Sequence, residues 1–177
     1  MVGIGIGRPL AVAQLAPGKG VTQMRTEIAK MLPVPLKNGF DYLDDYKMWP
    51  DWYVGMTEVL DPAMAQWVFP GDSVKFAYRL LGRRVEGVST LDEKIDGEFV
   101  RFHSDVPGLP RVYHEFHYGT AGDEAFILKV VLETKEDELT SFFGKVIDKT
   151  MLPRVLDRDL RGSLDNLEEI FVAGLHE

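Results

Sequence analysis

The chain has 177 residues, of which 45% are hydrophobic and 27% are charged, and it contains no cysteine. This length fits one hydrophobic core, and the apolar content is too high for a disordered chain. The lack of cysteine excludes disulfides, thiolate metal sites and thiol nucleophiles. The net charge of −8 argues against binding to nucleic acid or to an anionic lipid surface, because both are bound through clustered Lys and Arg. We therefore expect one cytoplasmic domain with no nucleic-acid partner and no stable membrane insertion.

Residues 1–20 are rich in Gly, Ala and small aliphatic residues and follow neither a helical nor a strand period. They lack the basic start of a secretory signal, and the apolar stretch at residues 10–16 is too short to span a bilayer. The run Gly3-Ile4-Gly5-Ile6-Gly7 looks like a nucleotide loop, but no strand precedes it and no helix of a βαβ unit follows. We therefore expect no cofactor. We interpret residues 1–20 as an N-terminal arm before a domain at residues 21–177, with a cleaved segment as the alternative.

The first part of this domain combines one strand with short helical pieces. Mixed polar and β-branched residues predict a strand over residues 21–31, which Pro33 ends. Apolar residues at helical spacing then predict a short helix over residues 36–45. The sequence Trp49-Pro50-Asp51-Trp52 marks a turn into a second short helical piece, and strand character returns at residues 56–60.

The middle of the chain contains alternating segments joined by short turns, and one register satisfies them all. The pairs that define this register are Leu80 with Val85, Ile95 with Glu98, Leu91 with Phe102, Ser89 with Ser104, Phe102 with His114, and Tyr118 with Phe126. It brings opposite charges together in the pairs Arg79 with Glu86, Arg111 with Glu133, and a ladder of Asp92, Arg101, Glu115 and Lys129. Because such pairs stabilise a sheet only slightly, the ladder serves as a test of register.

Residues 139–175 repeat apolar side chains at helical intervals, which predicts one continuously apolar helix face. Pro153 should start a new helix or kink one. We therefore expect a preliminary turn and then a main helix from about Pro153 onward.

Several local phrases in this order of elements match a known family. They are Pro33-Val34-Pro35-Leu36 leading to Phe40-Asp41-Tyr42-Leu43, Trp49-Pro50-Asp51-Trp52 with Gly55-Met56, and Arg158-Asp159-Leu160 with Ser163-Leu164-Asp165-Asn166-Leu167. Here, and over nearly everything after residue 20, the chain resembles the SRPBCC superfamily, which includes START and Bet v 1-like proteins. The likeness is closest to its polyketide cyclase/dehydrase and lipid-transport-like group. The resemblance implies an α+β helix-grip fold, in which a curved seven-stranded antiparallel sheet surrounds a long C-terminal helix and two short helices follow the first strand.

The predicted register assigns a mostly apolar row to the inner face of the sheet. The row comprises Val74, Phe76, Tyr78, Leu80, Val85, Gly87, Ser89, Leu91, Val100, Phe102, Ser104, Val112, His114, Phe116, Tyr118, Phe126, Leu128, Val130 and Leu132, with Glu93 near its rim. A few polar groups on an apolar concave wall are typical of a small-molecule site. The residues predicted to bind a ligand are Phe76, Tyr78, Ser89, Leu91, Phe102, Ser104, His114, Phe116, Tyr118, Leu128 and Val130. The ligand expected is a hydrophobic small molecule such as a lipid, an isoprenoid or a polyketide.

The alternative function is a polyketide aromatase/cyclase or dehydratase, in which His114, Tyr78 or Tyr118 relays protons. His114 also has two simpler interpretations: it binds a ligand carbonyl, or it is a core histidine satisfied by Ser104, Tyr118 or water. Ser89 and Ser104 face one another, and a hydrogen-bonded pair is a better interpretation than a nucleophile because no orienting third group is visible.

Neither the histidines nor the tryptophans define a further site. We expect no metal site, because His114 and His117 point to opposite faces of one strand and His103 lies beside Tyr113. The three tryptophans either cap the mouth of the pocket or fasten the short helices to the sheet. They are Trp49, Trp52 and Trp67.

Overall fold

The computed structural model describes residues 24–65, 67–134 and 151–174, in which seven antiparallel strands form one sheet. The strands are β1 (Met24–Leu32), β2 (Met56–Leu60), β3 (Ser73–Leu80), β4 (Arg83–Ile95), β5 (Phe99–Asp105), β6 (Val112–Thr120) and β7 (Phe126–Thr134). Their order across the sheet is β1-β7-β6-β5-β4-β3-β2. The predicted N-terminal arm and the predicted helical turn before residue 151 lie outside the described residues.

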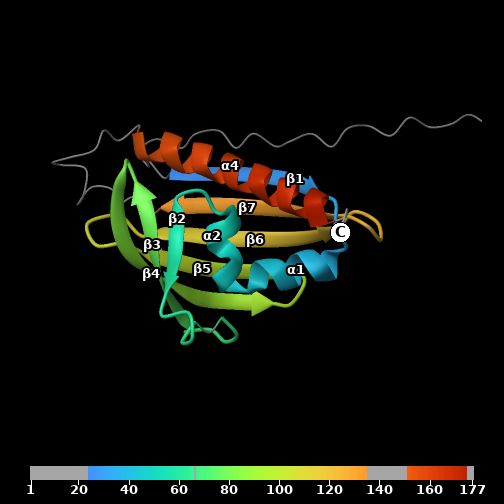
Figure 1. Cartoon of the computed structure of the whole chain (residues 1–177), viewed down its shortest axis with the longest axis horizontal. Coiled ribbons are helices and arrows are strands. Elements are labelled where there is room, and N and C mark those ends of the chain that lie inside the picture. The colour runs from blue at the N-terminus through green and yellow to red at the C-terminus, as the bar shows by residue number, and fades with distance from the viewer. Residues whose placement is uncertain (1–23, 66, 135–150, 175–177) are drawn as a thin grey trace, which may run out of the picture.

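The helices lie on one face of this curved sheet (Figure 1). Between β1 and β2 the chain forms α1 (Leu36–Asp44), a 3₁₀ turn η1 (Tyr46–Met48) and α2 (Trp49–Trp52), and after β7 it forms α4 (Met151–Gly174). In Figure 1, α4 runs along the β1 and β7 side of the sheet, whereas α1 and α2 lie in front of its centre. This architecture confirms the predicted helix-grip fold.

The helix α4 covers the sheet because its apolar side chains recur on one stripe. Leu160, Leu164, Leu167 and Phe171 follow the three- and four-residue spacing of a helix face, and each is at most 8% exposed. Pro153 lies in the first turn of α4, where a missing N–H leaves no intrahelical hydrogen bond unmade. The predicted main helix is therefore confirmed, with its first residue just before Pro153.

The turn between β3 and β4 differs from the prediction. Leu80 pairs with Arg83, not with Val85, and Arg79 stands opposite Arg84, not Glu86. The turn residues are Leu81 and Gly82, which take φ values of 49° and 80°. Positive φ at both central residues is the type I′ geometry that matches strand twist, although it rarely uses leucine. Because the register moves by two residues, each side chain keeps its predicted face.

The hairpin between β4 and β5 contains a bulge that the sequence did not reveal. Ile95 pairs with Phe99, not with Glu98, so the loop is one residue longer than the predicted turn. A bulge between Leu91 and Glu93 absorbs that residue. Beyond the bulge the predicted pairs of Leu91 with Phe102 and Ser89 with Ser104 are confirmed, as is Phe102 with His114 on the next strand.

The pairing of β6 with β7 is also shifted by two residues. Tyr118 pairs with Leu128, not with Phe126, because the strands continue to the pair of Thr120 with Phe126 before the loop begins. The predicted pair of Arg111 with Glu133 is therefore wrong, and Tyr113 stands opposite Glu133. Because side chains alternate between the two faces of a strand, a shift of two residues leaves the same β7 side chains on the inner face.

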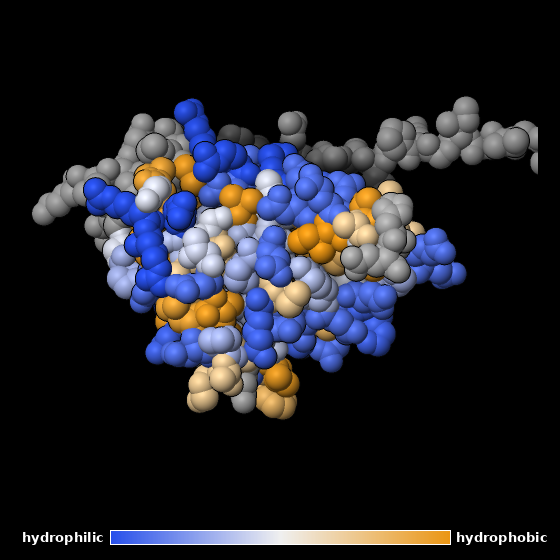
Figure 2. All heavy atoms as spheres, in the orientation of Figure 1, coloured by the Kyte–Doolittle hydropathy of each residue, from blue (hydrophilic) through white to orange (hydrophobic). Residues whose placement is uncertain are grey.

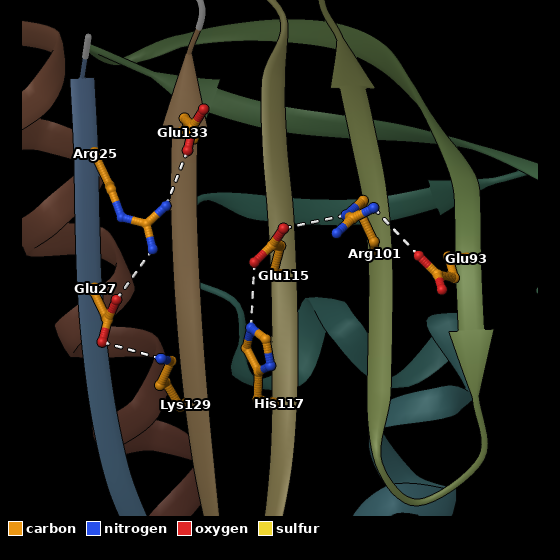
Figure 3. A network of polar contacts seen from close by, with 8 residues as sticks. All are labelled: Arg25, Glu27, Glu93, Arg101, Glu115, His117, Lys129 and Glu133. Carbon is orange, nitrogen blue, oxygen red and sulfur yellow. Dashed lines mark hydrogen bonds and ion pairs between the residues drawn. The ribbon is translucent and has the colours of Figure 1, made fainter.

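The outer-face charges form two groups rather than the predicted ladder (Figure 3). In one, Arg101 contacts Glu115 at 3.1 Å and Glu93 at 3.2 Å, so Glu93 takes the place predicted for Asp92. In the other, Arg25 contacts Glu133 at 3.0 Å, and Lys129 contacts Glu27 at 3.2 Å instead of Glu115. The bulge in β4 and the shift of β7 together account for both changes.

The connection between β2 and β3 carries exposed apolar side chains. Met64, Val68 and Phe69 are 77%, 55% and 70% exposed. Figure 2 shows orange and pale orange spheres projecting below the sheet, where Figure 1 places this connection. Among the described helices, none is long and apolar enough to cross a membrane.

Candidate functional site

A cavity of about 70 Å³ lies between the inner face of the sheet, η1, α2 and α4. Its wall is formed by Tyr46, Trp49, Tyr53, Met56, Phe76, Tyr78, Leu80, Phe102, Ser104, Val106, Leu109, Pro110, Val112, His114 and Leu156. The half-buried wall residues Val106, Leu109 and Leu156 mark where the cavity meets the surface. Its mouth therefore lies between the β5–β6 loop and the first part of α4.

Trp49 is the central side chain of the aromatic wall. Its indole lies parallel to Tyr46 at 4.3 Å and to Phe116 at 5.6 Å between ring centroids, and it meets Phe102 edge to face at 5.3 Å. Its Nε1 donates to the carbonyl oxygen of Leu43 at 2.8 Å. Trp49 thus fastens the short helices to the sheet, as one of the two predictions has it, and it also forms cavity wall.

His114 projects from the middle of β6 into the cavity wall. Its ring lies flat on Phe102, with centroids 4.3 Å apart and an angle of 8°. Neither ring nitrogen has a hydrogen-bond partner among the described residues, so the predicted bonds to Ser104 or Tyr118 are absent there. Burial lowers the pKa of His114 to about 3, with a smaller contribution from His103. The imidazole is therefore neutral at pH 7, and its donor and its acceptor both remain available.

A chain of three hydroxyl groups ends at the cavity close to this histidine. The Tyr46 hydroxyl lies 2.8 Å from Ser89 Oγ, which lies 2.8 Å from Ser104 Oγ. The predicted serine pair is thus confirmed as a hydrogen bond. Burial raises the pKa of Tyr46, so all three groups are uncharged at neutral pH.

A second polar cluster stands where β3 meets α4. The Tyr78 hydroxyl donates to Asp159 Oδ2 at 2.8 Å, and Arg158 donates to Asp159 Oδ1 at 2.7 Å. Burial raises the pKa of Tyr78, and the nearby Tyr53 adds to the shift. Gly55, with φ at 91°, has room for no Cβ because one would come within 2.5 Å of the Tyr78 ring. The backbone at Gly55 therefore holds the tyrosine against α4.

Only some of the predicted ligand-binding residues line the cavity. Five of them line it: Phe76, Tyr78, Phe102, Ser104 and His114. The other six, which do not line it, are Ser89, Leu91, Phe116, Tyr118, Leu128 and Val130. Of the candidates for catalysis, His114 and Tyr78 reach the cavity and Tyr118 does not. Glu93 points to the outer face, where it pairs with Arg101.

Sequence reasoning missed the wall contributed by the short helices and the loops. Tyr46, Trp49 and Tyr53 come from η1, α2 and the residue after it, and Val106 and Leu109 come from the β5–β6 loop. The high aromatic content of residues 46–53 is the one signal in the sequence, but it does not predict which of these side chains point towards the inner face of the sheet. Asp159 stands in one of the phrases that resemble the SRPBCC superfamily, and no pattern in the sequence predicts its contact with Tyr78.

The cavity wall is uncharged as far as the structure describes it. Its described lining residues include no Asp, Glu, Lys or Arg. Within the described ranges, no group of three or more His, Cys, Asp or Glu is arranged to hold a metal ion. The arrangement suits an apolar molecule with a polar group directed at His114 and Ser104.

Comparisons with known proteins give the fold a wider context. No family model matches the sequence, and no curated protein matches it either. Among solved structures, a START superfamily protein from Mycobacterium smegmatis is similar, with a TM-score of 0.68 and 8% identity over 84% of this chain and 97% of that chain.

Two further structures resemble the chain to a comparable degree. The aromatase/cyclase Zhui from Streptomyces sp. R1128 has a TM-score of 0.67 and 16% identity over 83% of this chain and 92% of its own. The protein Ara h 8.0201 has a TM-score of 0.63 and 13% identity over 85% of this chain and 99% of its own. These likenesses and the observed architecture together show that the chain has the helix-grip fold of the SRPBCC superfamily, which includes START and Bet v 1-like proteins.

Proposed function

We propose that the protein binds a hydrophobic small molecule in the cavity between the sheet, α2 and α4. The observation that carries this proposal is an uncharged, largely apolar wall, rich in aromatic rings, that contains a buried histidine with no partner among the described residues. Packed cores satisfy their polar groups, so a polar group left open on a cavity wall supports a ligand. A lipid, an isoprenoid or a polyketide has the required apolar body.

The volume of the cavity sets a condition on binding. At about 70 Å³ the cavity is well below the roughly 300–1,000 Å³ of drug-sized ligand pockets. A ligand with several rings or a long chain therefore enters only when mouth side chains such as Leu109 and Leu156 move apart. These residues are half-buried and come from a loop and a helix, so their displacement leaves the sheet intact.

An aromatase/cyclase or dehydratase activity is the second candidate. It is supported by the buried contact of Tyr78 with Asp159 at the wall and by the similarity to the aromatase/cyclase Zhui. Against it, a histidine with a pKa of about 3 is a weak base, and burial keeps Tyr78 protonated. The groups at the wall thus favour hydrogen bonding to a ligand over proton transfer. Turnover of a β-ketone chain that survives in both His114→Ala and Tyr78→Phe would exclude this mechanism.

Native mass spectrometry of the purified protein, followed by solvent extraction, tests the binding proposal. We expect a co-purifying apolar molecule, or saturable binding of an apolar fluorophore that such a molecule displaces. The variant Val112→Phe adds a ring to the cavity wall and should weaken binding at least tenfold. Val172→Phe makes the same change at a 41% exposed position on α4 and should leave binding unchanged. If both variants bind like the wild type, the cavity is not the site.

A further inference from the structure

The open histidine defines the polar group that the cavity accepts. A neutral imidazole carries one N–H donor and one acceptor nitrogen, and in His114 neither has a partner among the described residues. The parallel contact with Phe102, at 4.3 Å, fixes the plane in which both groups point. A hydroxyl group can pair with either nitrogen, and a carbonyl oxygen can accept from the N–H.

Ser104 supplies a second uncharged contact on the same wall. Its Oγ bonds to Ser89 at 2.8 Å, and since a hydroxyl donates once and accepts twice, that bond leaves capacity for another. Ser104 is half-buried and lines the cavity, as His114 does. The same wall therefore carries two neutral polar side chains, and because the ring nitrogens of His114 are themselves fully enclosed, a ligand oxygen reaches them when neighbouring lining side chains move.

The described part of the wall offers no counter-charge to an anionic group. Its described lining residues include no Lys or Arg, and the guanidinium of Arg158, on α4, is 74% exposed and pairs with Asp159. The low pKa of His114, about 3, keeps it from becoming a cation at neutral pH. A carboxylate bound here would lose its hydration without gaining a counter-charge, which is strongly unfavourable.

We propose that His114 and Ser104 bind an uncharged oxygen group, a hydroxyl or a ketone carbonyl, on an otherwise apolar ligand, and that the cavity rejects carboxylates. This inference rests on the proposed ligand-binding function. Under this inference, the cavity binds uncharged alcohols and ketones more tightly than fatty acids and other anions with the same hydrocarbon body.

The test uses four one-ring probes that differ in one substituent: ethylbenzene, 1-phenylethanol, acetophenone and benzoate. One-ring probes are used because the cavity, at about 70 Å³, is smaller than the roughly 150 Å³ that holds benzene in an engineered cavity, so each probe needs only a limited displacement of the mouth side chains. Titrations followed by NMR of the ¹⁵N-labelled protein at pH 7 give the four Kd values. We expect the alcohol and the ketone to bind roughly tenfold more tightly than ethylbenzene, the gain of one or two net hydrogen bonds. Benzoate should bind no more tightly than ethylbenzene.

The variant His114→Phe removes both nitrogens and keeps a flat ring against Phe102. It should bind ethylbenzene within about twofold of the wild type and lose the tenfold advantage of the alcohol and the ketone. His117→Phe, on the opposite face of the same strand, is the matched control and should keep that advantage. Ser104→Ala is the second variant if His114→Phe does not fold, and it should lose part of the advantage.

The outcomes separate this inference from the function on which it rests. If all four probes bind equally, if benzoate binds as tightly as acetophenone, or if the advantage persists in His114→Phe, the inference is overturned while ligand binding stands. If no probe binds, ethylbenzene included, the proposed function fails and the inference fails with it.

Discussion

The inner face of the sheet consists of two unlike halves. In the packed half, Leu128 and Val130 of β7 and Leu164 and Leu167 of α4 are at most 1% exposed, and none of them lines the cavity. In the cavity half, side chains of β3, β5 and β6 surround an internal space and include His114, whose ring nitrogens have no hydrogen-bond partner in the described part of the chain. The same alternating pattern produced both halves, so the difference lies in what covers them. The long helix α4 runs along the β1 and β7 side of the sheet (Figure 1), whereas η1, α2, the β5–β6 loop and the first part of α4 line the cavity on the other side.

The largest expected effect contrasts leucines from the two halves. Leu164→Ala removes a fully buried side chain from α4 and should lower the free energy of unfolding by about 2–5 kcal/mol. Leu156→Ala, at the cavity mouth, should cost less than about 1 kcal/mol, because its side chain is half-buried and already borders a space. Urea unfolding of both variants measures this contrast. Equal losses would mean that the two halves are equally well packed.

The next prediction concerns the polar contact that joins the halves. Asp159→Ala leaves the buried Tyr78 hydroxyl without its acceptor and should cost about 1–3 kcal/mol. Asp165→Ala removes a 70% exposed carboxylate from the same helix and should cost less than about 1 kcal/mol. Thermal unfolding at pH 7 compares the two. A smaller loss in Asp159→Ala than in Asp165→Ala would contradict the proposed link between β3 and α4.

The third prediction uses the pKa of His114, which burial depresses from 6.5 to about 3. Between these values the unfolded chain binds the proton and the folded chain does not, so protonation favours unfolding. The free energy of unfolding therefore has its full value above about pH 6.5, and it decreases as the pH falls from 6.5 towards 3. From pH 7 to pH 5 the wild type should lose about 2 kcal/mol more than His114→Phe. Parallel denaturant titrations at both pH values measure the difference, and identical pH dependence in the two proteins would show that folding does not lower the pKa of His114.

These contrasts also explain which features the sequence could predict. Strand alternation specifies the face of each side chain, and the wrong turns at β3–β4 and β6–β7 shifted the register by two residues, so the inner row survived there. The predicted β4–β5 hairpin is wrong by one residue, which moves Glu93 to the outer face. The sequence also predicted the apolar stripe of α4 and the pair of Ser89 with Ser104. It could not predict the bulge at Leu91, because the extra residue changes no periodicity on either side.

The division of the inner face was beyond sequence reasoning for a different reason. A residue such as Leu128 satisfies the same pattern whether it faces a ligand or a helix, and only the path of α4 decides which. The aromatic residues at positions 46–53 are as apolar as any core segment, and their tertiary placement alone makes Tyr46 and Trp49 cavity wall. Six of the predicted site residues therefore belong to packed core or to the hydroxyl chain.

The smallest expected effect tests whether the difference between the halves is confined to the inner face. Arg25 contacts Glu133 beyond the packed half, and Arg101 contacts Glu115 beyond the cavity half (Figure 3). The two arginine side chains are 49% and 43% exposed, so water and salt screen both contacts to a similar extent. Arg25→Gln and Arg101→Gln should each cost less than about 1 kcal/mol in low salt, and less still in 1 M salt.

Urea unfolding at low and high salt measures these two small losses side by side. A loss above about 2 kcal/mol in Arg101→Gln alone would show that the outer charges also hold the cavity half together. Equal small losses in the free energy of unfolding would mean that the outer charges do not distinguish the two halves. The halves would then differ only in the elements that pack against the inner face. In that case, filling the existing space beside His114 with a slightly larger apolar side chain should stabilise the cavity half, because apolar contacts added within that volume displace no packed neighbour.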